Sequence, residues 1–183
     1  MKINQLSNHL LIATPALTDP IFANTVVYID SHDKSGAHGY IINKTLPTTL
    51  AKVLKHLDIV PDYPRHRSIP IFDGGPMKKN QGVVISPANT RNTPNASLVA
   101  ITSNKRLLEH IAKGKGPKDY MVVLGSSHWS ADQLETEIIR NDWLTAPCNL
   151  DILFHTSIQK RRQLAAQLIS VNLSHLTGET GHA

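Results

Sequence analysis

Short apolar runs bounded by turn residues alternate with amphipathic stretches along this chain of 183 residues. Such alternation is typical of β-strands interleaved with α-helices. Eight runs predict strands, over residues 9–13, 25–30, 39–43, 69–72, 82–86, 98–101, 120–124 and 150–154. The pattern therefore predicts a mixed sheet with helices packed against it.

Four amphipathic stretches predict helices. Leu50, Val53, Leu54 and Leu57 recur at i, i+3, i+4 and i+7, which places their side chains on one buried stripe. Three further helices are expected behind capping candidates, which are Ser103, Ser130 with Gln133, and Thr156 with Gln159. Gly114 is placed to end the first of these three.

The length bounds the number of domains and the means of folding. A chain of this size buries roughly 70% of the surface that it exposes when unfolded, so it folds without a disulfide or metal staple. We expect one globular domain over residues 1–183. The single cysteine, Cys148, cannot form an internal bridge, which excludes the disulfide-rich secreted class and fits a reducing compartment.

No segment predicts a membrane span or a cleaved signal. The longest apolar runs, residues 10–13 and 121–124, are far shorter than the roughly 20 residues that cross a bilayer. Residues 10–16 resemble the apolar core of a signal peptide, but only Lys2 adds positive charge ahead of them. We therefore expect a cytoplasmic protein with no membrane partner.

The net charge of +5 is concentrated in the middle of the chain. Residues 61–120 hold ten Lys and Arg against four acids, whereas residues 121–183 hold four against six. Charged residues are 18% of the chain against a typical value of about 25%, and no helix-turn-helix signature accompanies them. Direct nucleic-acid binding is therefore an alternative and not the leading hypothesis, and it would use Lys105, Arg106, Lys113, Lys115 and Lys118.

A serine stands between a predicted strand and a predicted helix, in Gly125-Ser126-Ser127-His128-Trp129. Hydrolases place a nucleophilic serine in such a turn, but Trp129 replaces the second glycine of the Gly-x-Ser-x-Gly pattern. A small hydrolase using Ser127 with His128 or His155 is a second alternative. The favoured interpretation is a strand-to-helix turn in which Ser130 caps the helix and Trp129 packs beneath it.

Two segments carry possible ligands without a complete site. Asp30-Ser31-His32-Asp33 offers three metal-binding side chains, but no His-x-x-x-His or Cys-x-x-Cys spacing accompanies them, so a polar hairpin shoulder is favoured. Residues 113–118 resemble a phosphate loop in composition only, because they follow a predicted helix and lack the Gly-Lys-Ser/Thr ending. We expect no metal and no cofactor.

The segment Asp73-Gly74-Gly75-Pro76 follows a predicted strand. Two consecutive glycines indicate backbone that no side chain can crowd, because of a tight turn, a neighbouring strand or a ligand. A turn is the favoured interpretation. If the chain has a pocket, this segment is the best candidate for its wall.

Several segments resemble the AlgH/YqgE family of bacterial proteins, and the resemblance covers nearly the whole chain. The matching segments include Leu10-Leu11-Ile12-Ala13-Thr14-Pro15, Asp19-Pro20-Ile21-Phe22, Gly36-Ala37-His38-Gly39, Gly74-Gly75-Pro76, Asn141-Asp142-Trp143-Leu144 and the terminal Gly181-His182-Ala183. The chain departs from the family pattern at residues 125–129, where the family has Gly-Tyr-Ala-Gly-Trp. Ser127 and His128 are therefore not part of that pattern, which weakens the hydrolase alternative.

The resemblance implies an α+β fold, an α/β sandwich built on a mixed, bifurcated sheet with helices packed on it. It also implies a role in transcriptional regulation, for which the family has no agreed catalytic residue, cofactor or DNA-binding motif.

Our leading hypothesis is a non-enzymatic regulatory or interaction protein that binds a protein partner or a small ligand in a concave patch. Glycines, polar groups and an aromatic gather at predicted strand ends, where α/β proteins place pockets. Changing Trp129 and Glu135 is expected to abolish partner capture without unfolding the protein. The expected lining is Asp19, Pro20, Phe22, His32, Gly74, Gly75, Pro76, Gly125, Trp129, Gln133 and Glu135.

Overall fold

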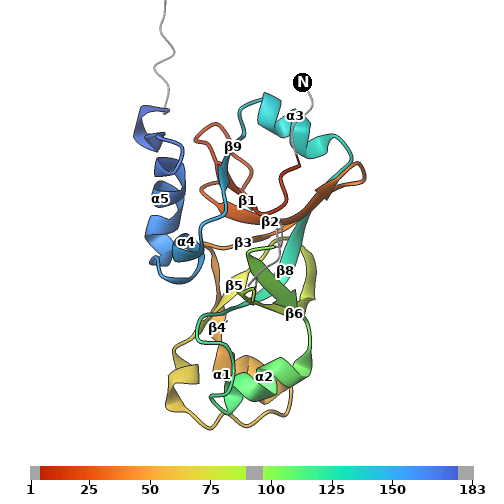
Figure 1. The fold of residues 1–183 in the computed structure, drawn as a ribbon, viewed down its shortest axis with the longest axis vertical. Coiled ribbons are helices and arrows are strands. Elements are labelled where there is room, and N and C mark those ends of the chain that lie inside the picture. Colours follow the sequence, from red (N-terminus) through yellow and green to blue (C-terminus); the bar gives the residue numbers. More distant parts are fainter. Residues whose placement is uncertain (1–4, 90–96, 177–183) are drawn as a thin grey trace, which may run out of the picture. The chain divides into compact units, whose positions relative to one another are not determined.

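The computed structural model describes residues 5–89 and 97–176, so the terminal Gly181-His182-Ala183 lies outside it. The chain divides into two compact units. Unit 1 comprises Met1–Asn43 and Ser127–Ala183, and unit 2 comprises Lys44–Ser126. Strand β8 (Met121–Ser130) contributes its first six residues to unit 2 and the rest to unit 1 (Figure 1). The single domain expected over residues 1–183 stays a prediction.

The strands of unit 1 pair in the order β8, β3, β2, β1, β9, and every pair is antiparallel. Leu10 of β1 pairs with Tyr28 on one side and with Ala146 on the other. A bulge interrupts the pairing of β2 with β3 between Ile29 and Ser31. The bounds are β1 (His9–Ala13), β2 (Val26–Asp33), β3 (Gly36–Ile41) and β9 (Trp143–Pro147).

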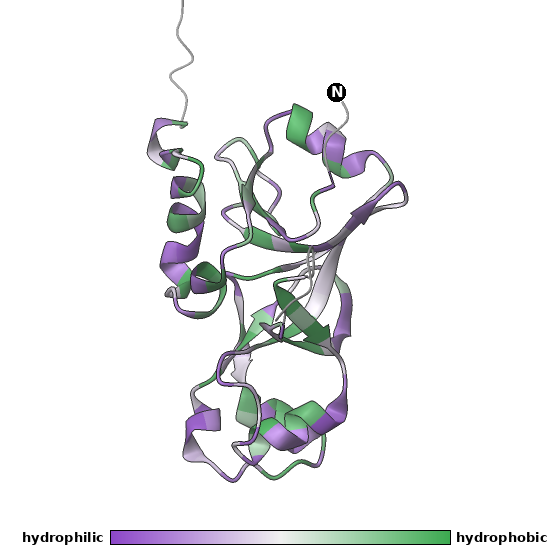
Figure 2. Ribbon diagram, in the orientation of Figure 1, coloured by the Kyte–Doolittle hydropathy of each residue, from purple (hydrophilic) through white to green (hydrophobic). Residues whose placement is uncertain are grey.

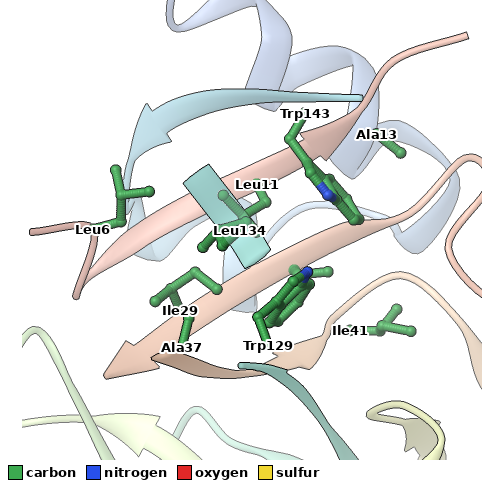
Figure 3. Packing of buried hydrophobic residues seen from close by; sticks show 10 residues of the cluster. Leu6, Leu11, Ala13, Ile29, Ala37, Ile41, Trp129, Leu134 and Trp143 are labelled. Carbon is green, nitrogen blue, oxygen red and sulfur yellow. The ribbon is translucent and has the colours of Figure 1, made fainter. Parts of the chain in front are cut away.

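Both faces of the unit 1 sheet are covered by helices. Leu10 to Ala13 are all buried, although alternate residues of a strand point to opposite faces. Leu11 and Ala13 belong to the cluster that includes Leu134 of α3, while α5 contacts β1, β2 and β9. Figure 3 shows that cluster, with the indole rings of Trp129 and Trp143 in it. The helices are α3 (Gln133–Ile139), α4 (Leu150–Phe154), α5 (Arg161–Gln167), η2 (Ile158–Lys160) and η3 (Leu173–His175).

Two arginines of α5 hold the backbone of unit 1. Arg161 is buried and donates to the carbonyl oxygen of Ile42. Arg162 donates to the carbonyl oxygen of Ala13 through Nε and Nη2, at 3.0 and 2.7 Å. Burial lowers the pKa of Arg161 to about 10, so this side chain still carries its charge at neutral pH.

Unit 2 has a mixed sheet in the order β4, β5, β8, β6, β7. β5 runs parallel to β8, and the other pairs are antiparallel. Helices α1 and α2 both contribute to the hydrophobic cluster of this unit, and each carries hydrophobic and hydrophilic residues (Figure 2). Leu50 and Leu54 of α1 and Ile111 of α2 are buried against Ile71, Val84 and Val122 of the sheet. The bounds are β4 (Thr45–Thr49), α1 (Leu50–His56), η1 (Pro64–Arg67), β5 (Pro70–Asp73), β6 (Met77–Pro87), β7 (Val99–Thr102) and α2 (Lys105–Ala112).

The predicted α+β fold is confirmed. The described residues form nine strands and five α-helices, and the sheet branches at β8, which pairs with β3, β5 and β6. In the described part of the chain, no helix is both long and apolar enough to cross a membrane.

Three local predictions are wrong. Residues 150–154 form helix α4 and not a strand, because the Asn149 side chain caps them by accepting the N–H of Ile152 at 3.1 Å. Strands β4 and β9 were not predicted. Residues 125–129 are not a turn, because β8 continues to Ser130.

The predicted ends of α2 and the predicted start of α3 lie near the expected residues. The cap predicted at Thr156 is wrong, because its hydroxyl donates to the carbonyl oxygen of Asp151 and α5 begins at Arg161. Asn104, and not Ser103, caps α2 by accepting the N–H of Arg106 at 2.9 Å. Gly114 follows the end of α2 and has a φ of +70°, so the helix cannot continue through it. Glycine tolerates this conformation better than other residues. Ser130 ends β8, and its N–H donates to Oε1 of Gln133 at 3.0 Å, which is one half of the predicted capping box.

Candidate functional site

Five of the predicted site residues lie on helix α3 or are linked to it within unit 1, and they are Phe22, His32, Trp129, Gln133 and Glu135. The first contact to α3 is made by His32. Its ring is buried, and Nδ1 accepts the N–H of Leu6 at 3.1 Å. Nδ1 therefore has no proton, so Nε2 carries it and donates to Oε1 of Glu135 at 2.8 Å. This contact fastens α3 to β2.

A second contact to α3 is made by two tryptophans. Oε2 of Glu137 accepts the indole N–H of Trp129 at 2.9 Å and of Trp143 at 2.8 Å, and its Oε1 accepts from Gln133 at 2.9 Å. The ring of Phe22 lies 5.7 Å from the ring of Trp129. Hydrogen bonds thus reach α3 at Glu135 and Glu137, while Oε2 of Glu135 is buried with no hydrogen-bond partner among the described residues.

The position of Trp129 corrects one expectation about the site. Only 1% of Trp129 is exposed, so it packs in the core and presents no surface to a partner. Replacing it would open a large cavity in the core, a change that typically costs 3–5 kcal/mol. A change at Trp129 is therefore expected to destabilise the fold, which makes it unsuitable as a test of partner capture.

Asp19 and Pro20 form an exposed turn in unit 1. Oδ1 of Asp19 accepts the N–H of Ile21 at 2.8 Å and of Phe22 at 3.0 Å. These bonds shape the turn that delivers Phe22 to the tryptophans.

The predicted glycines belong to unit 2, where they serve close packing of strands. The N–H of Gly74 donates to the carbonyl oxygen of Leu124 at 2.8 Å. A Cβ atom on Gly74 would lie 2.4 Å from the carbonyl oxygen of Gly125. Of the interpretations offered for Gly74-Gly75-Pro76, a neighbouring strand is the one that this contact supports.

The hydrolase alternative depended on a turn at residues 125–129, and the structure has a strand there. Ser127 lies inside β8, buried and paired with Gly39 of β3. His155 is exposed, and its Nδ1 lies 3.0 Å from Oδ1 of Asp151. The predicted nucleophile turn is therefore wrong. Within residues 5–89 and 97–176, no three His, Cys, Asp or Glu side chains are grouped so that they could hold a metal ion.

Unit 2 contains a cavity of about 540 Å³ between α1, α2 and the sheet. Its apolar lining is Val53, Leu57, Val83, Val84, Leu108, Val122 and Leu124. Its polar lining is Thr48, Lys52, His56, Lys79, Asn80, Thr102, Ser103, Asn104 and Lys105, with Gly82. The size falls within the roughly 300–1,000 Å³ of small-molecule sites.

Three lysines line this cavity. Lys52 comes from α1, Lys79 from β6, and Lys105 is the first residue of α2. Among the described residues that line the cavity, none is Asp or Glu.

This cavity was not predicted from the sequence, although the residues of α1 indicate it. Lys52 and His56 are four residues apart, and so are Val53 and Leu57, which places a basic stripe beside an apolar stripe on one helix. From the sequence, the apolar residues of this helix predicted only a buried stripe.

The five residues of the nucleic-acid alternative are all exposed, on α2 and the loop after it. Lys105 also lines the cavity. Tyr63 lies beside this loop, because a Cβ atom on Gly114 would be 2.7 Å from the Tyr63 ring. The guanidinium of Arg65 lies over the same ring, 5.3 Å from its centre.

Burial lowers the pKa of the neighbouring His66, which is therefore neutral at pH 7.

A family model described as AlgH-like matches residues 10–174. The chain belongs to the AlgH-like family. Membership confirms the resemblance drawn from the sequence, and it extends through both units.

Relatives of similar length support this assignment. An AlgH-like relative, a UPF0301 protein of Coxiella burnetii (strain Dugway 5J108-111), is 43% identical over 183 residues, covering 100% of this chain and 99% of its own. A UPF0301 protein of Thioalkalivibrio sulfidiphilus is 43% identical and covers 98% of each chain.

Two solved structures are similar to the AlgH-like fold described above. The solution structure of the AlgH protein from Pseudomonas aeruginosa has a TM-score of 0.77 and 38% identity, and covers 100% of this chain and 98% of that one. The crystal structure of a protein from Corynebacterium diphtheriae has a TM-score of 0.71 and covers 97% and 94% of the two chains. At 16% identity, this second likeness shows the fold alone.

Proposed function

We propose that this protein is a non-catalytic binding protein that takes a small ligand into the cavity of unit 2. The main support for this proposal is the composition of the cavity, which is lined by apolar side chains together with several hydrogen-bonding and basic side chains. Ligand occupancy then regulates the association of the protein with a protein partner in the cytoplasm.

A fragment screen tests this proposal. Isotope-labelled protein is titrated with a library balanced among anionic, neutral and cationic fragments, and backbone amide shifts are followed by NMR. We expect shifts to concentrate at lining residues such as Val53, Leu108 and Val122. A Val53→Trp variant, which fills the cavity, should lose them, while Ile139→Trp on exposed α3 should keep them. If no fragment perturbs the lining at millimolar concentration, the proposal fails.

A second candidate, nucleic-acid binding, is favoured by the basic loop beside Tyr63 and Arg65. An exposed aromatic ring next to several cations is the combination that binds single-stranded nucleic acid. If all five predicted Lys and Arg side chains contacted the phosphates of a single strand, log affinity would fall with log salt at a slope of about −3.5. Changing Lys113 and Lys115 to Gln would reduce the magnitude of this slope by about 1.4, whereas Lys160→Gln in unit 1 would not. No binding at low salt would exclude the candidate.

A further inference from the structure

We infer that the ligand of the unit 2 cavity is an amphipathic anion, with a carboxylate or phosphate head on an aliphatic body. This inference rests on the proposed function, because it names the class of ligand that the same cavity takes.

The body of the ligand follows from the apolar side chains. Val53 and Leu57 of α1 and Leu108 of α2 line the cavity together with Val84 and Val122, which pair across β6 and β8. These side chains are aliphatic, and no Phe, Tyr or Trp is among the described lining residues. A nucleobase or another flat ring would have no aromatic surface to stack on, so an aliphatic body fits better.

The head of the ligand follows from the charges. Lys52, Lys79 and Lys105 come from three different elements and line the same cavity. Lys52 and Lys105 are exposed, so their long side chains can turn their ammonium groups to a ligand at the cavity mouth. Three lysines without a lining carboxylate attract anions and repel cations.

One acidic group lies near this set and must be counted. Oδ2 of Asp73 is 4.0 Å from Nζ of Lys79, and 63% of the Lys79 side chain is exposed. That separation is beyond hydrogen-bond distance, so the pair is loose and Lys79 remains able to donate to a ligand. Lys52 and Lys105 are therefore the better positions for a test.

Four ten-carbon amphiphiles separate the contributions of charge and apolar contact. Decanoate, decyl phosphate, decanol and decyltrimethylammonium are titrated below their aggregation concentrations, with NMR shifts at Val53 and Leu108 as the readout. We expect both anions to bind at least tenfold more tightly than decanol, and the cation to bind most weakly. Whichever anion binds more tightly identifies the head group as carboxylate or phosphate.

Lysine variants assign the effect to the cavity. Lys52→Gln with Lys105→Gln should weaken anion binding about tenfold and leave decanol binding unchanged. The matched control, Lys55→Gln with Lys113→Gln, removes two exposed lysines that do not line the cavity and should change neither. All four positions are exposed, so these variants should fold, as circular dichroism will show.

Failure of the inference can be told apart from failure of the proposed function. Equal binding of decanoate and decanol, unchanged in the Lys52 and Lys105 variant, would overturn the anionic head and leave a cavity that binds by apolar contact alone. Preferential binding of the cation would overturn it too. Absence of lining shifts with all four amphiphiles and with every screened fragment would overturn both.

Discussion

The Nε2 atom of His32 lies 2.8 Å from Oε1 of Glu135, and this hydrogen bond joins strand β2 to helix α3 across 103 residues of sequence. His32 is buried and receives the Leu6 N–H at its other nitrogen. The ring is thus held on both sides, which makes α3 part of the unit 1 core.

Removal of the Glu135 carboxylate should destabilise the protein. Glu135→Ala leaves the buried Nε2–H of His32 without its acceptor, a loss that costs about 1–3 kcal/mol. Urea denaturation measures the change in the free energy of unfolding. Glu135→Gln keeps an oxygen acceptor and should cost less. Equal stability of Glu135→Ala and the wild type would contradict the role assigned to this bond.

Glu137 should matter more than Glu135, because it accepts two indole N–H groups. Glu137→Leu leaves the indoles of Trp129 and Trp143 unpaired in the core, and we expect a loss of about 2–5 kcal/mol. Trp143→Phe removes only one of the two bonds but also shrinks a buried side chain. Near-ultraviolet circular dichroism of Glu137→Leu should show weaker tryptophan signals. An unchanged spectrum and unchanged stability would show that these bonds are dispensable.

The thiol of Cys148 should be unreactive in the folded protein. Burial raises its pKa from 9.0 to about 12, so very little thiolate, the reactive form, exists at pH 8. Alkylation by iodoacetamide at pH 8 should be far slower for folded protein than for protein in urea. Equal rates would contradict the assigned burial.

The same shift gives a pH dependence of stability. A pKa that is higher in the folded state means that the folded protein holds this proton more tightly. The contribution of Cys148 is therefore fully present below about pH 9 and is lost as pH rises toward 12. Cys148→Ala should flatten this part of the stability profile, and an unchanged alkaline slope would contradict the assignment.

Gly125 should not tolerate a side chain. Its φ is +76°, and a Cβ atom would lie 2.6 Å from the carbonyl oxygen of Gly75. Gly125→Ala should therefore lose more than about 2 kcal/mol, from left-handed backbone strain of about 1–2 kcal/mol together with the clash. Gly82→Ala on the neighbouring strand is the control, since its Cβ atom would meet the end of the Leu124 side chain, which can move. Similar melting temperatures for the two variants would contradict this account.

Strands that are buried and rich in branched residues were predictable from the sequence. Residues 9–13 are strand β1, because one uninterrupted apolar run suits a strand with both faces covered. The two missed strands, β4 and β9, are at the ends of the strand order, and each contains a proline, Pro47 or Pro147. Proline argues against a strand in a sequence pattern, but it is tolerated in strands at the edge of a sheet. These two strands were therefore missed.

The candidate site was less predictable than the fold. The pattern brought Phe22, His32, Trp129, Gln133 and Glu135 to attention, and they do lie in one cluster. Their spacing could not show that their polar groups bond to each other. The cavity is formed by residues of α1, α2 and β6, which are far apart in the sequence. Only the Lys52–His56 and Val53–Leu57 spacing on α1 indicated it.

Analysis of what the protein carries from the cell tests the central claim most directly. Full-length protein is purified without detergent, denatured in organic solvent, and the released small molecules are identified by mass spectrometry, with Val53→Trp as the comparison. The account predicts an amphipathic carboxylate or phosphate in stoichiometric amount from the wild type and its loss from the folded variant. An equal yield of the same compound from both proteins, or a cationic or aromatic compound from the wild type alone, would contradict it.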